Sequence, residues 1–182
     1  VCSSDLFVDW GKEEERKLKP LTNWKTGEED EDIIATYQVK LYRWANDEWK
    51  QRGRGCLKFL QHKDNKQIRI VMRQDQTKKV VANFYIFGEG CCKLERRLDK
   101  ERAWEWTCKD CSDGSYKIEK LSCKFEKKEE FEEFQKEFEK AREFNLKIYE
   151  EYLKSQEEKK EKVEDQVKKE PGKELPNSSK EE

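Results

Sequence analysis

The sequence contains a single histidine, His62, and this scarcity excludes most of the familiar catalytic arrangements. A Cys–His or Ser–His couple could form only around that residue, which stands beside Lys63 and Asp64 in a segment typical of an exposed turn. A phosphate-binding glycine loop is also missing, because Gly53-Arg54-Gly55 lacks the further glycines and the helix that should follow. We therefore expect a protein that is not an enzyme, with no catalytic residues and no cofactor.

Long apolar runs and a disulfide framework are missing too. No segment approaches the ~18 consecutive apolar residues of a membrane-spanning helix. The 7 cysteines are odd in number, Cys91 and Cys92 are adjacent, and no secretory signal opens the sequence, so we expect reduced thiols in a soluble intracellular protein. Cys108 and Cys111 have the spacing of a zinc or redox pair, but suitably spaced further ligands are lacking, and no metal is expected.

Charge is abundant and unevenly distributed. Charged residues make up 45% of the chain and hydrophobic residues 34%, which is too little apolar side chain to bury the whole length. Lys and Arg number 5 against 10 Asp and Glu in residues 1–35, 21 against 12 in residues 36–125, and 14 against 19 in residues 126–182. A basic body between acidic flanks favours an anionic partner at the body. Nucleic acid, an anionic membrane and an acidic peptide all fit this pattern.

Short alternating segments in the basic body predict β-strands. Val39 and Leu41 share one face of the first segment while Lys40 and Tyr42 share the other. Turn signals such as Asn46-Asp47 separate the segments. The expected strands are Tyr37–Trp44, Trp49–Arg52, Cys56–His62, Gln67–Gln74, Lys79–Tyr85, Arg102–Cys108 and Tyr116–Phe125. Seven short strands at close spacing indicate an antiparallel barrel or sandwich.

A helix is expected after Lys127, where the apolar period changes from two to about 3.6. Its apolar stripe consists of Phe131, Phe134, Phe138, Ala141, Ile148 and Tyr152, and we expect this stripe to pack on the β body. Beyond Ser155 the apolar residues end. The predicted organisation is an acidic arm over residues 1–35, a folded domain over 36–145, and a helix end with a disordered charged tail over 146–182.

Cationic residues recur on the predicted strands, several of them two positions apart, so they should project from one face of the sheet. They are Lys50, Arg52, Arg54, Lys58, Arg69 and Arg73. Such a face could bind RNA through phosphate contacts and stacking, or hold a run of carboxylates through paired Arg hydrogen bonds. The composition leaves both possibilities open.

Several segments match a known family in order and at compatible spacing. They are Thr26-Gly-Glu-Glu-Asp-Glu-Asp32, Val39-Lys-Leu-Tyr-Arg43, Glu48-Trp-Lys-Gln-Arg-Gly53, Arg69-Ile-Val-Met-Arg73 and Arg102-Ala-Trp-Glu-Trp106, followed by the Phe-rich helix. Over roughly residues 25–145 the chain resembles the Ran-binding domain family, and its layout resembles the family's cytosolic single-domain members. The resemblance implies a mainly β, pleckstrin-homology-like barrel of seven strands capped by one C-terminal amphipathic helix.

The same resemblance implies a partner. Family members bind the small GTPase Ran in its GTP state, hold Ran's acidic C-terminal tail on their basic face, and embrace a basic patch on Ran with their acidic arm. They form a ternary complex with the GTPase-activating protein, promote hydrolysis and release transport receptors in nucleocytoplasmic transport. We therefore expect a cytoplasmic location, with shuttling through the nucleus or residence at the pore left open. We expect no nucleic-acid or membrane partner; the alternative is a phosphoinositide- or RNA-binding module.

Carried over position by position, the resemblance assigns Lys50, Arg52 and Arg73 to contacts with the acidic tail, with Lys58 and Arg69 as supporting charge. Trp49, next to this basic pair in sequence, is assigned to the same tail-binding surface. The resemblance assigns the arm to Glu28, Glu29, Asp30 and Glu31. Trp104 and Trp106 are expected in the core. The chain departs from the family at Gln74, where a second arginine is usual, and in the loop from Phe87 to Lys100, which brings Cys91, Cys92, Arg96 and Arg97.

Overall fold

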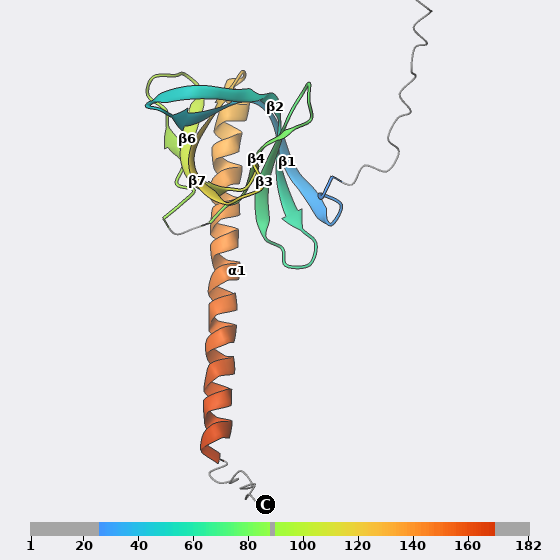
Figure 1. The fold of residues 1–182 in the computed structure, drawn as a ribbon, viewed down its shortest axis with the longest axis vertical. Coiled ribbons are helices and arrows are strands. Elements are labelled where there is room, and N and C mark those ends of the chain that lie inside the picture. The colour runs from blue at the N-terminus through green and yellow to red at the C-terminus, as the bar shows by residue number, and fades with distance from the viewer. Residues whose placement is uncertain (1–25, 88–89, 170–182) are drawn as a thin grey trace, which may run out of the picture.

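The computed structural model describes residues 26–87 and 90–169, which form a strongly curved antiparallel sheet and one long helix (Figure 1). The elements are β1 (Glu31–Ala45), β2 (Glu48–His62), β3 (Ile68–Gln74), β4 (Val80–Tyr85), β5 (Glu95–Arg96), β6 (Ala103–Asp110), β7 (Lys117–Phe125) and α1 (Lys128–Lys169). The order of the strands in the sheet is β4-β3-β2-β1-β7-β6-β5. This architecture confirms the predicted fold class.

Two of the predicted strands are one strand in the structure. Residues 49–52 and 56–62 both belong to β2, which passes without interruption through Gly53 and Gly55. A side chain at Gly55 would place its Cβ only 1.9 Å from the backbone oxygen of Arg73, so glycine allows β2 and β3 to pair closely here. The seventh strand is instead β5, within the segment predicted to be a loop.

The sheet closes on itself where β4 meets the end of β6. The backbone N–H of Asn83 donates to Oδ1 of Asp110 at 2.7 Å, and the N–H of Cys111 donates to the carbonyl oxygen of Asn83 at 2.9 Å. Because these bonds join the two distant ends of one sheet, the strands form a barrel with an open side. Helix α1 packs its first turns against the inner face of the curved sheet and extends beyond it (Figure 1).

The first half of α1 fills the barrel with aromatic side chains. Phe134 and Phe138 are fully buried, and the Phe134 ring lies 5.0 Å from that of Phe125. Trp104 stacks on Phe131 with ring centroids 4.6 Å apart, and its Nε1–H donates to the Phe131 carbonyl oxygen at 2.9 Å. Trp104 and Trp106 are both buried, as predicted. Each large aromatic side chain buried in this way contributes about 1.5–3 kcal/mol to folding.

One buried polar side chain fixes the helix to the strands. Asn145 accepts a hydrogen bond from the Ile68 N–H at 2.8 Å and donates to the carbonyl oxygens of Ile68 and Ile86 at 2.7 and 2.9 Å. The helix then continues to Lys169, well past the domain boundary predicted at residue 145, with Tyr152 exposed rather than packed on the sheet. The predicted three-part division of the chain stays a prediction. Within the described residues, no helix has the length and apolar character needed to cross a bilayer.

Candidate functional site

Three of the predicted cations lie together on the outer face of β2 and β3. Arg73 is paired with Cys56 and Arg69 with Leu60 in the β2–β3 register, while Lys58 lies between them on β2. The alternate residues on these strands point into the core, so the three long side chains point away from it. The sequence pattern predicted this shared face correctly for these three residues.

A short acidic segment, residues 26–31, lies across this face; we call it the acidic turn. The Glu28 carboxylate accepts a hydrogen bond from Arg73 Nε at 2.8 Å and one from Lys58 Nζ at 3.0 Å. Arg73 also donates from Nη2 to the carbonyl oxygen of Thr26 at 2.9 Å. One carboxylate therefore forms ion pairs with two of the predicted partner-binding cations within the chain itself.

Glu31 pairs with the third cation. Arg69 donates from Nε and Nη2 to the two carboxylate oxygens of Glu31, both at 2.7 Å, and the Glu31 side chain is only 4% exposed. Arg69 also binds Asn83 Oδ1 and the carbonyl oxygen of Gly27, each at 2.9 Å. A planar guanidinium suits this paired geometry, and the Glu31 hydrogen bonds raise the pKa of Arg69. The acidic turn is thus held to the sheet by nearly buried ion pairs.

The carboxylates of Glu29, Glu28 and Asp30 differ in their surroundings. The Glu29 carboxylate accepts hydrogen bonds from the backbone N–H groups of Thr26 and Gly27, which lowers the pKa of Glu29 and closes the turn on itself. Burial alone would raise the pKa of Glu28, but its bonds from Lys58 and Arg73 lower the pKa below the ordinary value. Asp30 is exposed, and its carboxylate has no side-chain partner within the part of the chain that the structure describes.

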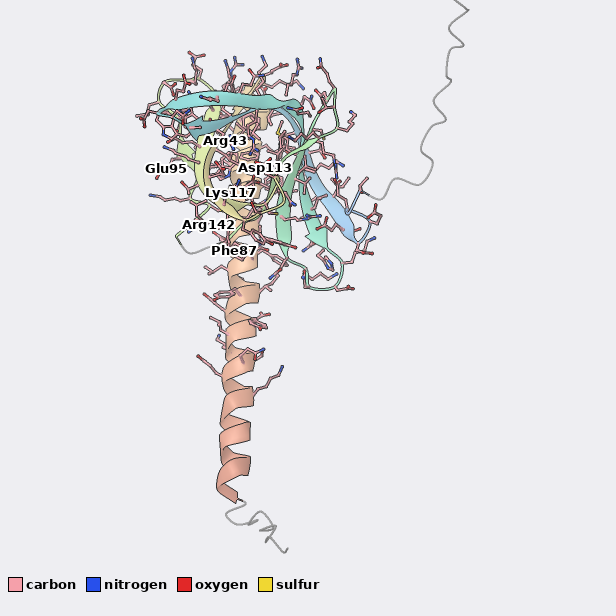
Figure 2. All side chains as sticks on the ribbon, in the orientation of Figure 1. Arg43, Phe87, Glu95, Asp113, Lys117 and Arg142 are labelled. Carbon is pink, nitrogen blue, oxygen red and sulfur yellow. The ribbon has the colours of Figure 1, made fainter. Side chains whose placement is uncertain are left out.

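Arg52 lies in a separate cluster. It is the extra residue of a β-bulge in β2, and its side chain, 13% exposed, contacts Asp110 at 3.4 Å and Asp113 at 2.9 Å. Asp113 also lies 4.0 Å from Arg43, and both are labelled in Figure 2. These pairs tie β2 to the β6–β7 hairpin, so in this structure Arg52 has a role in holding the barrel together.

Trp49 and Lys50 lie near the β1–β2 turn, away from the acidic turn. Lys50 is exposed and pairs with Glu48 at 3.1 Å. The guanidinium of Arg97 lies 4.5 Å from the centre of the Trp49 ring, and Arg97 is itself held by Asp99 at 2.6 Å. Sequence reasoning noted Arg97 only as a departure from the family pattern and missed this contact, since nothing in the loop's sequence indicates which strand it covers.

Cys108 and Cys111, which have the spacing of a zinc or redox pair, differ in their surroundings. Cys108 is buried, which raises the pKa of its thiol, and Cys111 is half-buried with its Sγ 3.1 Å from the carbonyl oxygen of Asn83. The described residues contain no group of three or more His, Cys, Asp or Glu side chains that could hold a metal ion.

Comparison with known proteins places these features in a family. The RanBP1 domain model matches residues 23–144, a range that includes the acidic turn, the whole barrel and the start of α1 up to residue 144. Over 127 residues, or 69% of this chain, the sequence is 40% identical to the E3 SUMO-protein ligase RanBP2 of Homo sapiens and of Pan troglodytes. It is 39% identical over the same length to the RANBP2-like and GRIP domain-containing protein 1 of Homo sapiens.

These relatives are far longer, and the chain spans only 4% of the RanBP2 proteins and 7% of the GRIP-domain protein. Among solved structures, the Ran-binding domain of the nuclear complex component Nup2 from Ashbya gossypii aligns with a TM-score of 0.51 at 24% identity, covering 62% of this chain and 96% of that one. That likeness shows the pleckstrin-homology-like fold alone. The family-model match over residues 23–144 shows more: the chain belongs to the RanBP1 domain family.

Proposed function

We propose that this chain binds the GTP-bound form of the small GTPase Ran. The observation that carries the proposal is the RanBP1 domain match over residues 23–144, since the matched range contains both the acidic turn and the basic strands. The relatives at about 40% identity are named as RanBP2 proteins, which supports the same partner. The net positive charge of residues 36–125 suits an acidic ligand such as Ran's C-terminal tail.

The acidic turn, in this proposal, meets a basic patch on Ran. Glu28 and Glu31 are occupied by Lys58, Arg69 and Arg73, so their part is to anchor the turn on the sheet. Asp30 and the neighbouring Asp32 are exposed and supply the charge that faces the partner. An arm anchored before binding loses less conformational entropy when it meets Ran than a free arm would.

Binding would act on Ran's nucleotide cycle without chemistry by this chain. We propose that bound Ran-GTP releases its transport receptors and is hydrolysed faster by the GTPase-activating protein in a ternary complex. The chain would then work in nucleocytoplasmic transport, at the cytoplasmic side or at the pore. A hydrolysis assay with the activating protein, with and without this chain, tests that step separately from binding.

The decisive experiment compares three forms of the partner. Calorimetric titrations would use Ran loaded with a non-hydrolysable GTP analogue, Ran-GDP, and analogue-loaded Ran lacking its acidic tail. Tight binding of the first form, with losses of at least about tenfold for the other two, is the expected result. Equal binding of all three would refute the proposal and direct attention to phosphoinositide vesicles and single-stranded RNA, the two other anionic ligands that the charge pattern allows.

Varying the form of Ran tests the proposal with fewer side effects on the fold than reversing the charge of Arg52 and Arg73 would. Both guanidinium groups hold carboxylates of this chain, Arg52 those of Asp110 and Asp113 and Arg73 that of Glu28. Their replacement by glutamate would leave these acids unpaired and put the fold itself at risk. A loss of binding in such a variant would therefore have two explanations.

A further inference from the structure

Two buried cysteines lie next to each other where the sheet closes. Cys92 belongs to the segment between β4 and β5, in which Phe87 and Glu95 are labelled in Figure 2, and Cys108 belongs to β6. The backbone N–H of Cys92 donates to the carbonyl oxygen of Thr107 at 2.7 Å. Thr107 directly precedes Cys108, so this bond places the two cysteine backbones side by side although they are 16 positions apart in the sequence.

The spacing of the two backbones suits a disulfide bond. The hydrogen bond of 2.7 Å, added to standard bond lengths on either side, puts the Cα atoms of Cys92 and Cys108 at most about 7 Å apart. Cysteines joined by a disulfide have Cα atoms about 4.4–6.8 Å apart. Both side chains are fully buried and belong to the same hydrophobic cluster, so both thiols lie in the interior of the barrel.

A further contact holds the Cys92 thiol near the end of β4. Its Sγ lies 3.7 Å from the carbonyl oxygen of Tyr85, the last residue of that strand. Two residues earlier, Asn83 accepts a hydrogen bond from the N–H of Cys111, which follows β6. Burial raises the pKa of the Cys108 thiol most, and the neighbouring Cys92 raises it further, which agrees with the short separation. The two thiols therefore lie where β4 and β6 meet.

This closure of the barrel is sparsely bonded. β4 and β6 are not neighbours in the strand order, and they meet through single hydrogen bonds such as those of Asn83. A covalent bond between Cys92 and Cys108 would restrain the chain at this point. A disulfide that closes a loop of about 15 residues stabilises a fold mainly by restricting the unfolded chain.

We propose that Cys92 and Cys108 form a reversible disulfide when the chain meets hydrogen peroxide. The peroxide oxidises one thiol to a sulfenic acid as its O–O bond breaks, and one water leaves. The second thiol then attacks that sulfur, a second water leaves, and the S–S bond forms. In sum, two thiols lose two electrons and two protons, and one hydrogen peroxide becomes two waters. This chemistry does not depend on Ran binding.

Burial makes the reaction slow. It raises the pKa of Cys92 to about 11, and it also raises the pKa of Cys108, so both thiols are protonated at neutral pH. The thiolate is the reactive form, and we expect oxidation at least about tenfold slower than that of free cysteine. The disulfide therefore answers sustained oxidation. Cys91 is half-buried and adjacent to Cys92, so it is the competing partner that an experiment must distinguish.

The test is peptide mapping of the full chain before and after treatment with hydrogen peroxide. Trypsin cleaves after Lys and Arg, so the two cysteines fall in separate peptides, residues 80–93 and 103–109. After alkylation of the remaining thiols, we expect these two peptides to be cross-linked, with fragmentation placing the bond at Cys92. Dithiothreitol should abolish the cross-link.

Thermal unfolding provides the second readout. We expect oxidation to raise the Tm by about 5–10 °C, and dithiothreitol to reverse the rise. Cys92→Ala and Cys108→Ala should each remove the rise. Cys91→Ala and Cys123→Ala, which remove a half-buried and a fully buried thiol, are the matched controls and should keep it.

Three results would overturn the proposal. A cross-link that persists in Cys92→Ala and vanishes in Cys91→Ala would assign the bond to Cys91. Alkylation or further oxidation of Cys92 and Cys108 without a cross-link would show that the two thiols do not meet. A cross-link without a rise in Tm would show that the bond does not restrain the closure. Because the mapping uses the unmodified chain, it decides the pairing even if an alanine variant fails to fold.

Discussion

Glu31 and Arg69 form a two-hydrogen-bond ion pair across 38 residues of sequence, with both N···O distances at 2.7 Å. The pair joins the first residue of β1 to β3, two strands away in the sheet. The Glu31 side chain is 4% exposed and that of Arg69 is 16% exposed, so both charged groups have lost most of their contact with water. The ion pair compensates each group for this loss of hydration. This pair fixes where the acidic turn leaves the barrel.

Breaking this pair should destabilise the fold. We expect Arg69→Met to lower the free energy of unfolding by about 3 kcal/mol, since Glu31 would remain as a nearly buried, unpaired carboxylate. Adding Glu31→Gln to the same chain should restore about half of the loss, because the unpaired charge is then removed. Urea denaturation of both variants measures this, and equal losses in the single and double variants would contradict it.

The ion pairs of Glu28 should make the stability of the fold decrease in acid. The pKa of Glu28 is lowered in the folded chain by Lys58 and Arg73, so its ion pairs stabilise the fold above the ordinary glutamate pKa. That stabilisation is lost as the pH falls through the lowered folded-state value, when Glu28 binds a proton. Glu28→Gln should therefore reduce stability at pH 7 and flatten its decline in acid, as thermal unfolding from pH 7 down to pH 3 would detect. An unchanged pH profile would show that Glu28 does not carry this dependence.

Arg97 is expected to shield Trp49 from solvent. Its guanidinium lies over the indole ring at 4.5 Å, and a stacked contact of this kind contributes about 0.5–2 kcal/mol. Arg97→Lys keeps the charge but loses the planar group, so acrylamide should quench an additional tryptophan more readily in this variant. The same substitution in a Trp49→Phe background serves as the control and should leave quenching unchanged. Equal quenching in the first comparison would show that Arg97 does not cover the ring.

Gly55 should be intolerant of any side chain. A Cβ there would meet the Arg73 carbonyl oxygen at 1.9 Å, so β2 and β3 would have to separate, and we expect Gly55→Ala to cost about 3 kcal/mol or more. Gly27→Ala is the matched control, because its φ of +75° is strained but no atom lies within 4 Å, and it should cost about 1 kcal/mol. Similar costs for the two variants in urea denaturation would contradict the packing argument.

Lys40 on β1 is paired directly with Arg54 on β2 and with Lys124 on β7, and we expect its replacement to give a small gain in stability. Replacing Lys40 by glutamine removes repulsion from both Arg54 and Lys124, so the free energy of unfolding should rise by about 0.2–1 kcal/mol at low salt. The gain should shrink as salt is added, because ions screen exposed charges. A loss of stability, or a gain independent of salt, would show that the repulsion is absent.

The sequence by itself determined the class of fold and the family. Strand alternation, the 3.6 period of the Phe-rich helix and the Trp-Lys and Arg-Ala-Trp segments are local patterns, and local patterns can be read without coordinates. The burial of Trp104 and Trp106 was expected from their large aromatic side chains. The shared face of Lys58, Arg69 and Arg73 was expected from strand alternation. The merged strand β2 was not expected, because glycine ends many strands and continues others where two backbones approach closely.

Only the tertiary structure decided what each charge meets. The sequence placed Glu28 and Arg73 on two separate binding surfaces, yet they contact each other across 45 residues. Likewise Lys40 and Lys124 lie far apart in the chain and become neighbours through the β1–β7 register. Strand register and loop placement arise from the packing of the whole barrel, so the pairing of distant charges is a property of that packing. Composition showed that this chain has a basic body; the fold determines which of its cations remain available to a partner.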